Sequence, residues 1–366
     1  MNVRYHVIAD LKINKAGLSD EEIARDPVLQ RQIRTKRYSI TSLCMHPGRG
    51  SVYCGVTNTG GNILLEFRPK TGKFVSLGYA KLAEPCEVKI HRGLWLDEPA
   101  NALYFGTATL SEIPQLVKAP GGRLVRYDID QRRFETLGIP IQGNYIQATN
   151  VDARRGLMYS FSIWDFCFAV WSLKRRKVVR VHPMASIVHV SAIDDDGGVW
   201  GTYSMYKQAF FRYDPDRDEL QFPEGCALPT ALAASNLMYR GAGPVDGMIN
   251  GGDGFMYVGS AMGELYRLDP RTHEIVYLGR PMPANRLPAL QVGADGLIYG
   301  VGGDANATTL FRYDRGRGSF ELLGKVLAPD GTACYRPHDL VVVGNTAYVG
   351  ETDNPKRSGY LWECRF

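Results

Sequence analysis

The sequence predicts an all-β protein, a seven-bladed β-propeller that is closed by its N-terminal strand. Two recurring patterns predict this fold. The first is a strand that ends in Arg-Tyr-Asp and is followed by a turn, as in residues 124–128, 211–214 and 311–314. The second is a short strand that carries an aromatic residue, and its seven copies run from Tyr53 to Tyr348. Successive copies lie roughly 49 residues apart, which is the spacing of a four-stranded propeller blade.

The two ends of the chain are predicted to meet in one blade. Residues 3–11 alternate between apolar and polar types, as a strand does. The first full repeat begins near Ser39, and the last stops within its third strand, at residues 361–364. If the N-terminal strand supplies the outer strand of this last blade, the ring keeps no unpaired sheet edge. Residues 1–366 then form a single domain.

A helical insertion is predicted before the first blade. Ser19 and Glu22 have the spacing of a capping box, in which each side chain bonds the backbone of the other residue. We therefore expect a helix within residues 20–35, interrupted or restarted near Pro27. This insertion would serve as a packing element or as a lid.

Each repeat is predicted to run as innermost strand, turn, aromatic strand, loop, third strand, turn and outer strand. Asp-Pro pairs at 214–215 and 269–270 follow third strands and are typical of hairpin turns. The acidic run 194–197 lacks the spacing and the terminal glutamate of a calcium-binding loop. We interpret it as another hairpin turn.

Composition limits the expected partners and compartment. The net charge is +5, without the lysine and arginine runs that bind nucleic acid. The seven cysteines include no Cys-X-X-Cys pair, which favours reduced thiols over a disulfide framework. The N-terminal residues have no apolar leader, and no stretch is long enough to span a bilayer. We expect a cytoplasmic protein that binds neither nucleic acid nor membrane, or a secreted one if a leader has been removed.

Three histidines occupy equivalent positions in different blades. His91, His189 and His338 each fall at the start of a predicted innermost strand, where two other blades have Gln147 and Asp246. Innermost strands surround the central axis of a propeller, and the loops that enter them form one face. We therefore expect these five residues to converge on one opening.

The loops of that face are rich in arginine and aromatic residues. Arginine binds a planar carboxylate through two donors, and aromatic rings stack on sugar rings. An acidic carbohydrate is therefore the expected partner. Besides Asp246 and His338, the expected binding residues are Trp164, Arg212, Arg240, Tyr335 and Arg336.

Most of the chain resembles the seven-bladed lyases that act on uronic acids. The resemblance is carried by the Arg-Tyr-Asp strands, by residues 334–339 (CYRPHD) and by residues 348–363, which begin YVGETDNP and end YLWE. This group includes rhamnose–glucuronate lyases, ulvan lyases and rhamnosidase-like relatives. The C-terminal segment is the more specific part of the resemblance.

The resemblance implies β-elimination at a uronic acid. This reaction needs a cation on the carboxylate and a base, histidine or tyrosine, that removes the neighbouring proton. His91 matches the family's histidine of the second blade, Arg336 its arginine of the last entry loop, and Arg212 an arginine of the fourth blade. Arg336 and Arg240 would hold the carboxylate. The expected catalytic residues are His91, His189, Tyr145 and Tyr203.

The chain departs from this family in the second blade. Where the family has a second histidine, residues 107–109 are Thr-Ala-Thr. This difference favours an alternative in which the propeller binds an acidic glycan without catalysis. A further alternative is a rhamnosidase-like glycoside hydrolase, with His46 on the opposite face as the key residue.

The expected elimination requires no cofactor. The alternative is a divalent metal ion in the central channel, where it would neutralise the charge of the substrate. Its candidate ligands are His91, His189 and His338, with Gln147 or Asp246. No motif of neighbouring ligands indicates such an ion, because the ligands would come from separate blades.

Overall fold

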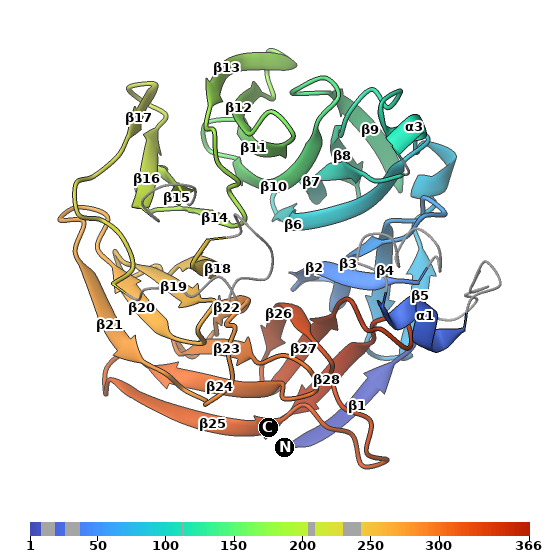
Figure 1. The fold of residues 1–366 in the computed structure, drawn as a ribbon, viewed down its shortest axis with the longest axis vertical. Helices are drawn as coiled ribbons and strands as arrows, with labels where there is room; N and C mark the ends of the chain where they lie inside the picture. Colours follow the sequence, from blue (N-terminus) through green and yellow to red (C-terminus); the bar gives the residue numbers. More distant parts are fainter. Residues whose placement is uncertain (9–18, 26–36, 112, 204–208, 230–242) are drawn as a thin grey trace.

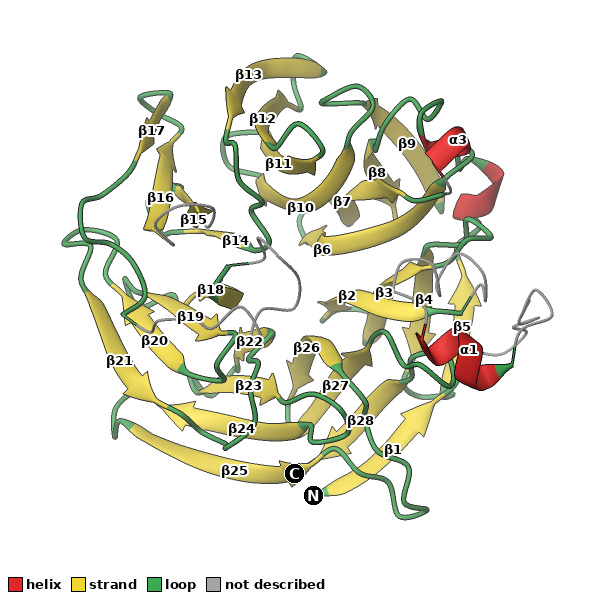
Figure 2. Ribbon diagram, in the orientation of Figure 1, coloured by secondary structure: helices red, strands yellow, loops and turns green. Residues whose placement is uncertain are grey.

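The computed structural model describes residues 1–8, 19–25, 37–111, 113–203, 209–229 and 243–366. In this part of the chain the fold is all-β, with antiparallel four-stranded units arranged around a central axis (Figure 1). Among the described residues, helix is confined to short segments at the periphery (Figure 2), namely α1 (Asp20–Arg25), the 3-10 helix η1 (Tyr79–Lys81) and α3 (Ile113–Leu116).

Each unit is a meander in which consecutive strands pair. The first unit comprises β2 (Ser39–His46), β3 (Ser51–Thr57), β4 (Leu64–Arg68) and β5 (Lys73–Ser76). The second comprises β6 (Glu87–Asp97), β7 (Ala102–Thr109), β8 (Leu124–Asp128) and β9 (Arg133–Gly138). The third comprises β10 (Tyr145–Asp152), β11 (Leu157–Ile163), β12 (Cys167–Ser172) and β13 (Lys177–Pro183). The fourth unit comprises β14 (Ser191–Ile193), β15 (Val199–Tyr203), β16 (Ala209–Asp214) and β17 (Glu219–Gln221). The fifth comprises β18 (Val245–Asn250), β19 (Met256–Ser260), β20 (Leu265–Leu268) and β21 (Ile275–Gly279). The sixth comprises β22 (Ala289–Val292), β23 (Ile298–Gly302), β24 (Thr309–Asp314) and β25 (Ser319–Lys325). The last unit joins β26 (Pro337–Val343), β27 (Thr346–Glu351) and β28 (Leu361–Arg365) to β1 (Asn2–His6).

The first strands of the units are neighbours around the axis. In order they are β2, β6, β10, β14, β18, β22 and β26, and β26 in turn contacts β2. Residues 39–46 and 337–343, at opposite ends of the chain, therefore lie side by side (Figure 1).

The core lies between neighbouring units rather than within one. Tyr159, in the second strand of its unit, packs against Tyr213 in the third strand of the next unit. Glycines in the second strands admit large neighbours from the next unit: a Cβ on Gly106 in β7 would lie 2.7 Å from the side chain of Ile146 in β10. The aromatic second strand of one unit therefore packs against the Arg-Tyr-Asp third strand of the next, and this contact accounts for both recurring patterns.

The last unit contains both ends of the described chain. β1 pairs antiparallel with β28, from Asn2 opposite Arg365 to His6 opposite Leu361. The buried carboxylate of Glu363 accepts hydrogen bonds from Arg4 and Arg365 and lies 2.9 Å from Nε2 of His6. The predicted N-terminal strand ends at residue 6 rather than 11, and residues 9–18 lie outside the described part.

The capping box predicted from the sequence is present. The backbone N–H and the hydroxyl of Ser19 both donate to Glu22 at 2.8 Å, and the backbone N–H of Glu22 donates back to Ser19 Oγ at 3.3 Å. The helix that follows, α1, covers Asp20–Arg25, and the remaining predicted residues 26–35 lie outside the described part.

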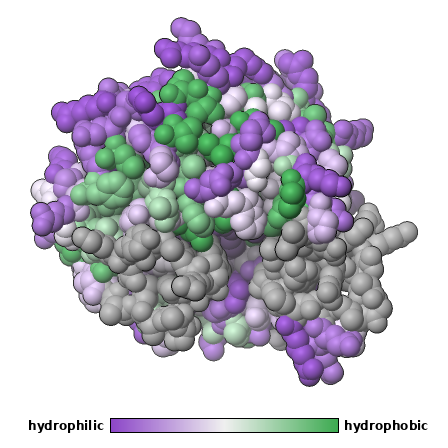
Figure 3. Space-filling view, turned by 45° about the horizontal axis from the view of Figure 1, so that its top comes forward, coloured by the Kyte–Doolittle hydropathy of each residue, from purple (hydrophilic) through white to green (hydrophobic). Residues whose placement is uncertain are grey.

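In the view of Figure 3, hydrophilic side chains gather along the upper edge of the molecule, and apolar areas lie below them. No helix in the described ranges is long and apolar enough to cross a membrane. All seven cysteines are free, and Cys54, Cys226, Cys334 and Cys364 are buried.

Candidate functional site

A layer of polar side chains crosses the axis where the innermost strands begin. We call this set the axial layer: His91, Arg92, Gln147, His189, Asp246, Arg286 and His338. The three histidines are only 2–6% exposed. The predicted convergence of residues from separate blades is therefore observed, but the layer is closed and is not an opening.

Hydrogen bonds across the layer order its histidines. His91 Nδ1 lies 2.8 Å from the backbone oxygen of Gln147, so this nitrogen carries the proton and donates. His91 Nε2 is then an acceptor, and His338 Nε2 donates to it over 3.2 Å. The side-chain amide of Gln147 donates to His189 Nδ1 over 2.7 Å. Each ring is thus held in one tautomer by its neighbour.

Two arginines share one carboxylate in the axial layer. Arg286 Nε donates to Asp246 Oδ2 at 2.9 Å, and Arg92 Nη2 donates to Asp246 Oδ1 at 3.1 Å. Arg92 also donates to the backbone oxygens of Asp246 and Pro288, at 2.7 and 3.1 Å. Strands β6, β18 and β22 are therefore tied together across the axis.

The axial layer is electrically positive. Burial, followed by the nearby cations Lys89, Arg92 and Arg286, holds the pKa of His189 well below its ordinary value. The pKa values of His91 and His338 are lowered in the same direction, again with burial as the largest cause. All three rings are therefore neutral at pH 7, and the positive charge resides on the arginines and on Lys89.

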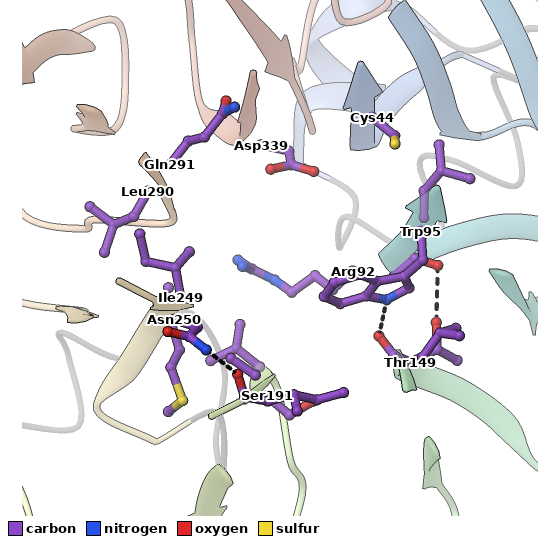
Figure 4. Close-up of a pocket in the computed structure, with 18 of the residues that line it drawn as sticks. Cys44, Arg92, Trp95, Thr149, Ser191, Ile249, Asn250, Leu290, Gln291 and Asp339 are labelled. Atoms are coloured by element: carbon purple, nitrogen blue, oxygen red, sulfur yellow. Dashed lines mark hydrogen bonds between the residues drawn. The ribbon is translucent and has the colours of Figure 1, made fainter. Parts of the chain in front are cut away.

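A central cavity of about 770 Å³ lies directly against the axial layer. It opens on the face that carries the turns between first and second strands, which we call the turn face. Its walls come from the first strands and those turns, and include Leu43 and His338. Figure 4 shows other wall residues, among them Cys44, Arg92, Trp95, Thr149, Asn250, Gln291 and Asp339. We expected the opening on the face with the entry loops; the described cavity lies on the opposite side, because the axial layer blocks the axis between them.

Arg92 reaches the cavity because β6 is irregular. The pairing of β6 with β7 shifts register between Ile90 and Leu94, and Arg92 has a left-handed backbone, with φ 40°. Gly93 follows, and a Cβ there would collide with Thr149. Such strain in a residue other than glycine is often found at functional sites. It directs the Arg92 side chain past Trp95 toward the axis, where its guanidinium bonds Asp246 (Figure 4).

Asp339 lies on another wall of the same cavity (Figure 4). Its carboxylate accepts the backbone N–H of Leu43 at 2.7 Å and that of Leu340 at 2.8 Å. Burial raises the pKa of Asp339 to about 6, although those two hydrogen bonds and Arg92 lower it. A carboxyl group with this pKa can both take and return a proton near neutral pH.

Several predicted site residues lie away from the cavity. Tyr145 is buried in a small apolar cluster, and Tyr203 packs against Phe222. Trp164 is 48% exposed in the turn after β11. Arg240 falls outside the described residues.

The described arginines expected on the substrate carboxylate do not line the central cavity. Arg336 donates to both oxygens of Asp304, at 2.9 and 3.0 Å, and its guanidinium covers the ring of Tyr335. Arg212 binds Asp194 at 2.8 Å at the turn between β14 and β15, on a third strand far from the axis. The structure therefore places Arg336, Tyr335 and Arg212 away from the cavity, contrary to our expectation.

His46, the key residue of the hydrolase alternative, lies on the turn face and is buried. It ends β2, it is only 7% exposed, and its Nε2 lies 2.8 Å from Asn101 Oδ1. It does not line the central cavity.

The described residues contain no group of three or more histidine, cysteine or acidic side chains arranged to hold a metal ion. In the axial layer, the ring nitrogens of His91 are used by Gln147 and His338, and Nδ1 of His189 is used by Gln147.

Sequence reasoning missed Arg92 and Asp339 as site residues. Each immediately follows a histidine that it did identify. In a regular strand, neighbours point to opposite sides, so Arg92 and Asp339 would face away from the histidines. The register shifts at Ile90/Leu94 and Pro337/Asp339 bring both residues to the cavity. The Arg-Gly pair after His91 was the available signal of a bulge.

No protein-family model matches the chain, and no curated protein does. Among solved structures, virginiamycin B lyase from Staphylococcus aureus matches with a TM-score of 0.64 at 14% identity, over 90% of this chain and 95% of that chain. A catalytically inactive histidine-to-alanine variant of that lyase, solved with quinupristin, matches with a TM-score of 0.66 at 13% identity, over 90% and 96%. A streptogramin B lyase structure matches with a TM-score of 0.64 at 14% identity, over 90% and 95%. These proteins are β-propellers, so the likeness identifies the fold of this chain as a β-propeller.

Proposed function

We propose that this chain is a carbon–oxygen lyase that acts on an acidic carbohydrate by β-elimination in the central cavity. The observation that carries the proposal is that Arg92 and Asp339, a cation and a carboxyl group of raised pKa, line the same cavity. The first can neutralise a uronate carboxylate, and the second can move the proton beside it.

The proposal includes a seven-bladed propeller that forms one domain and is closed by the N-terminal strand. Contacts between successive first strands, from β2 around to β26 and back to β2, support the ring. The pairing of β1 with β28 supports the closure. A ring closed in this way holds the axial layer rigidly, because its seven residues come from six different blades.

The charges around the cavity floor favour an anionic substrate. At or beneath the floor the cations are Lys89, Arg92 and Arg286, and the carboxylates are Asp246 and Asp339, while Asp353 is shared with Arg336. On the outer wall, Arg154 and Arg155 lie among Asp152, Asp194 and Asp195. A substrate carboxylate would balance the remaining positive charge. In a site with little water such an interaction is stronger than in solution.

The reaction can proceed with one proton-transferring group. The Asp339 carboxylate takes the proton from the carbon beside the substrate carboxylate while Arg92 stabilises the negative charge that develops there. The electron pair of that C–H bond forms the new C=C bond, and the C–O bond at the next carbon breaks. The departing oxygen takes the proton back from Asp339. No cofactor is required.

The comparisons with solved structures and the sequence each support a lyase reaction. The structures that share the fold include lyases, one of which is inactive as a histidine-to-alanine variant. The C-terminal segment resembles the uronate-acting lyases. The carbohydrate substrate itself is supported by the positive floor of the cavity and by the indole of Trp95 in its wall.

The proposed activity is tested with a panel of oligosaccharides that contain a uronic acid. Elimination produces a conjugated, unsaturated uronate, so near-ultraviolet absorbance is expected to rise with the wild-type protein and to stay flat with Asp339→Asn. Release of reducing sugar without that absorbance would instead indicate a hydrolase. Binding without turnover would overturn the lyase in favour of a glycan-binding propeller.

Activity is expected to rise with pH through about 6, because Asp339 must be ionised to act as the base.

The pKa of Asp339 is higher in the folded than in the unfolded chain, so the folded state binds the proton more tightly. Its contribution to stability is therefore present at low pH and lost as the pH rises through about 6. Urea unfolding at pH 4 and pH 8 should show this loss in the wild-type protein and not in Asp339→Asn. An unchanged pH profile of stability would contradict the assignment.

A further inference from the structure

A second cavity, of about 450 Å³, adjoins the central cavity on the turn face. It lies between the turn joining β22 to β23 and the turn joining β26 to β27. The two cavities share Met45, Gln291 and Val292 as wall residues. We call the second cavity the side groove. Its residues are Met45, Pro47, Gln291, Val292, Gly293, Ala294, Asp295, Tyr299, Val342, Val343, Gly344 and Asn345.

The side groove differs chemically from the central cavity. No lysine, arginine or histidine lines it, whereas Arg92, Arg154, Arg155 and His338 line the central cavity. Asp295, its one carboxylate, accepts the hydroxyl of Tyr299 at 2.8 Å and the backbone N–H of Leu297 at 3.1 Å. The remaining walls are mainly apolar side chains and neutral amides.

A hydrogen bond holds the wall that the central cavity and the side groove share. The side chain of Gln291 accepts the backbone N–H of Val342 at 2.5 Å, which ties the end of β22 to β26. Val343, on the next position of β26, is 39% exposed and presents an apolar surface in the groove. An extended molecule can therefore lie in both cavities at once, passing Gln291 at their junction.

We infer that the side groove is a second subsite, which takes a neutral unit with an apolar face joined to the acidic unit in the central cavity. This inference rests on the proposed function and narrows its substrate class to chains in which an acidic residue is linked to an uncharged one. A second acidic unit would be disfavoured in the groove, because Asp295 supplies a negative charge and no cation lines it.

Val343→Trp tests the subsite by filling the groove. Two substrates are compared: a disaccharide of an acidic and a neutral unit, and a methyl uronoside whose 4-oxygen carries only a methyl group. The Michaelis constant for the disaccharide is expected to rise about tenfold, while that for the small substrate is unchanged. The matched control is Val181→Trp, on the outer strand β13, where the valine is 43% exposed. Equal effects on both substrates, or none on either, would overturn the inference.

A binding measurement separates this inference from the proposed reaction. If the wild-type protein releases no unsaturated product, the lyase proposal fails. The groove is then judged by methyl NMR, with an uncharged methyl glucoside as the probe. Shifts at the methyl groups of Val292, Val342 and Val343 that disappear in Val343→Trp support the subsite. Their absence in the wild-type protein at saturating probe overturns it.

Discussion

Replacing Arg92 by methionine is expected to lower kcat/KM by about 1,000-fold, the loss typical of removing one group that stabilises developing negative charge. Methionine retains much of the length of the side chain but removes the charge and the donors. The fold should persist, because Asp246 keeps its hydrogen bonds with Arg286. Product absorbance gives the rate, and circular dichroism with thermal unfolding reports whether the fold is intact.

Two further variants show whether the loss of kcat/KM comes from a specific contact of Arg92 or from the loss of any positive charge in the cavity. Arg154 also lines the central cavity, but on its exposed rim. Arg154→Met should change kcat/KM by less than about threefold, because an exposed charge is screened by solvent. Arg92→Lys should retain part of the activity, since it keeps the charge but not the planar pair of donors. Equal losses in Arg92→Met and Arg154→Met would mean that general attraction of anions, rather than a specific contact, drives the reaction.

Replacing Glu351 by alanine is expected to destabilise the protein by about 3–5 kcal/mol, the range for breaking a buried ion pair. Glu351 is fully buried, and Arg357 Nη1 donates to its carboxylate at 2.7 Å. The carboxylate is also a hub for four other donors. They are the backbone N–H groups of Tyr335 and Tyr360, the amide of Asn354 and the indole of Trp362.

Urea unfolding measures this loss, with Glu321→Ala as the control. Glu321 also pairs with an arginine, Arg312, but its side chain is 58% exposed. The control should change stability by no more than about 0.5 kcal/mol, as most exposed substitutions do. If Glu351→Ala lowered the free energy of unfolding no more than Glu321→Ala, the hydrogen bonds of Glu351 would not stabilise the last unit.

The role of Glu351 also explains why the C-terminal segment is distinctive. Glu351, Asn354 and Arg357 bind one another, and the loop they form positions Trp362 in β28. Asp353, in the same loop, contacts Arg336 from the loop before β26. These residues build the last unit of the fold, and none of them lines the central cavity. The resemblance to uronate-acting lyases therefore rests largely on residues with a structural task.

The sequence alone determined the repeat and the strands. The Tyr159–Tyr213 contact shows why: the same packing recurs between successive units, so the same residue types recur at one spacing. It also determined that His91, His189 and His338 converge, since equivalent positions in a radial repeat lie at the same height along the axis. The capping box at Ser19 and Glu22 was readable because it depends only on neighbouring residues.

Only the tertiary structure decided which face carries the cavity and which residues line it. Arg92 and Asp339 reach it through register shifts in β6 and β26, and a shift of one residue reverses the direction of a side chain without changing the pattern of residue types. The pairing of Arg336 with Asp304, and of Arg212 with Asp194, likewise depends on residues that are distant in the sequence. A repeat specifies where a strand lies, but the partners of its charged side chains are set by contacts between units, which local sequence does not encode.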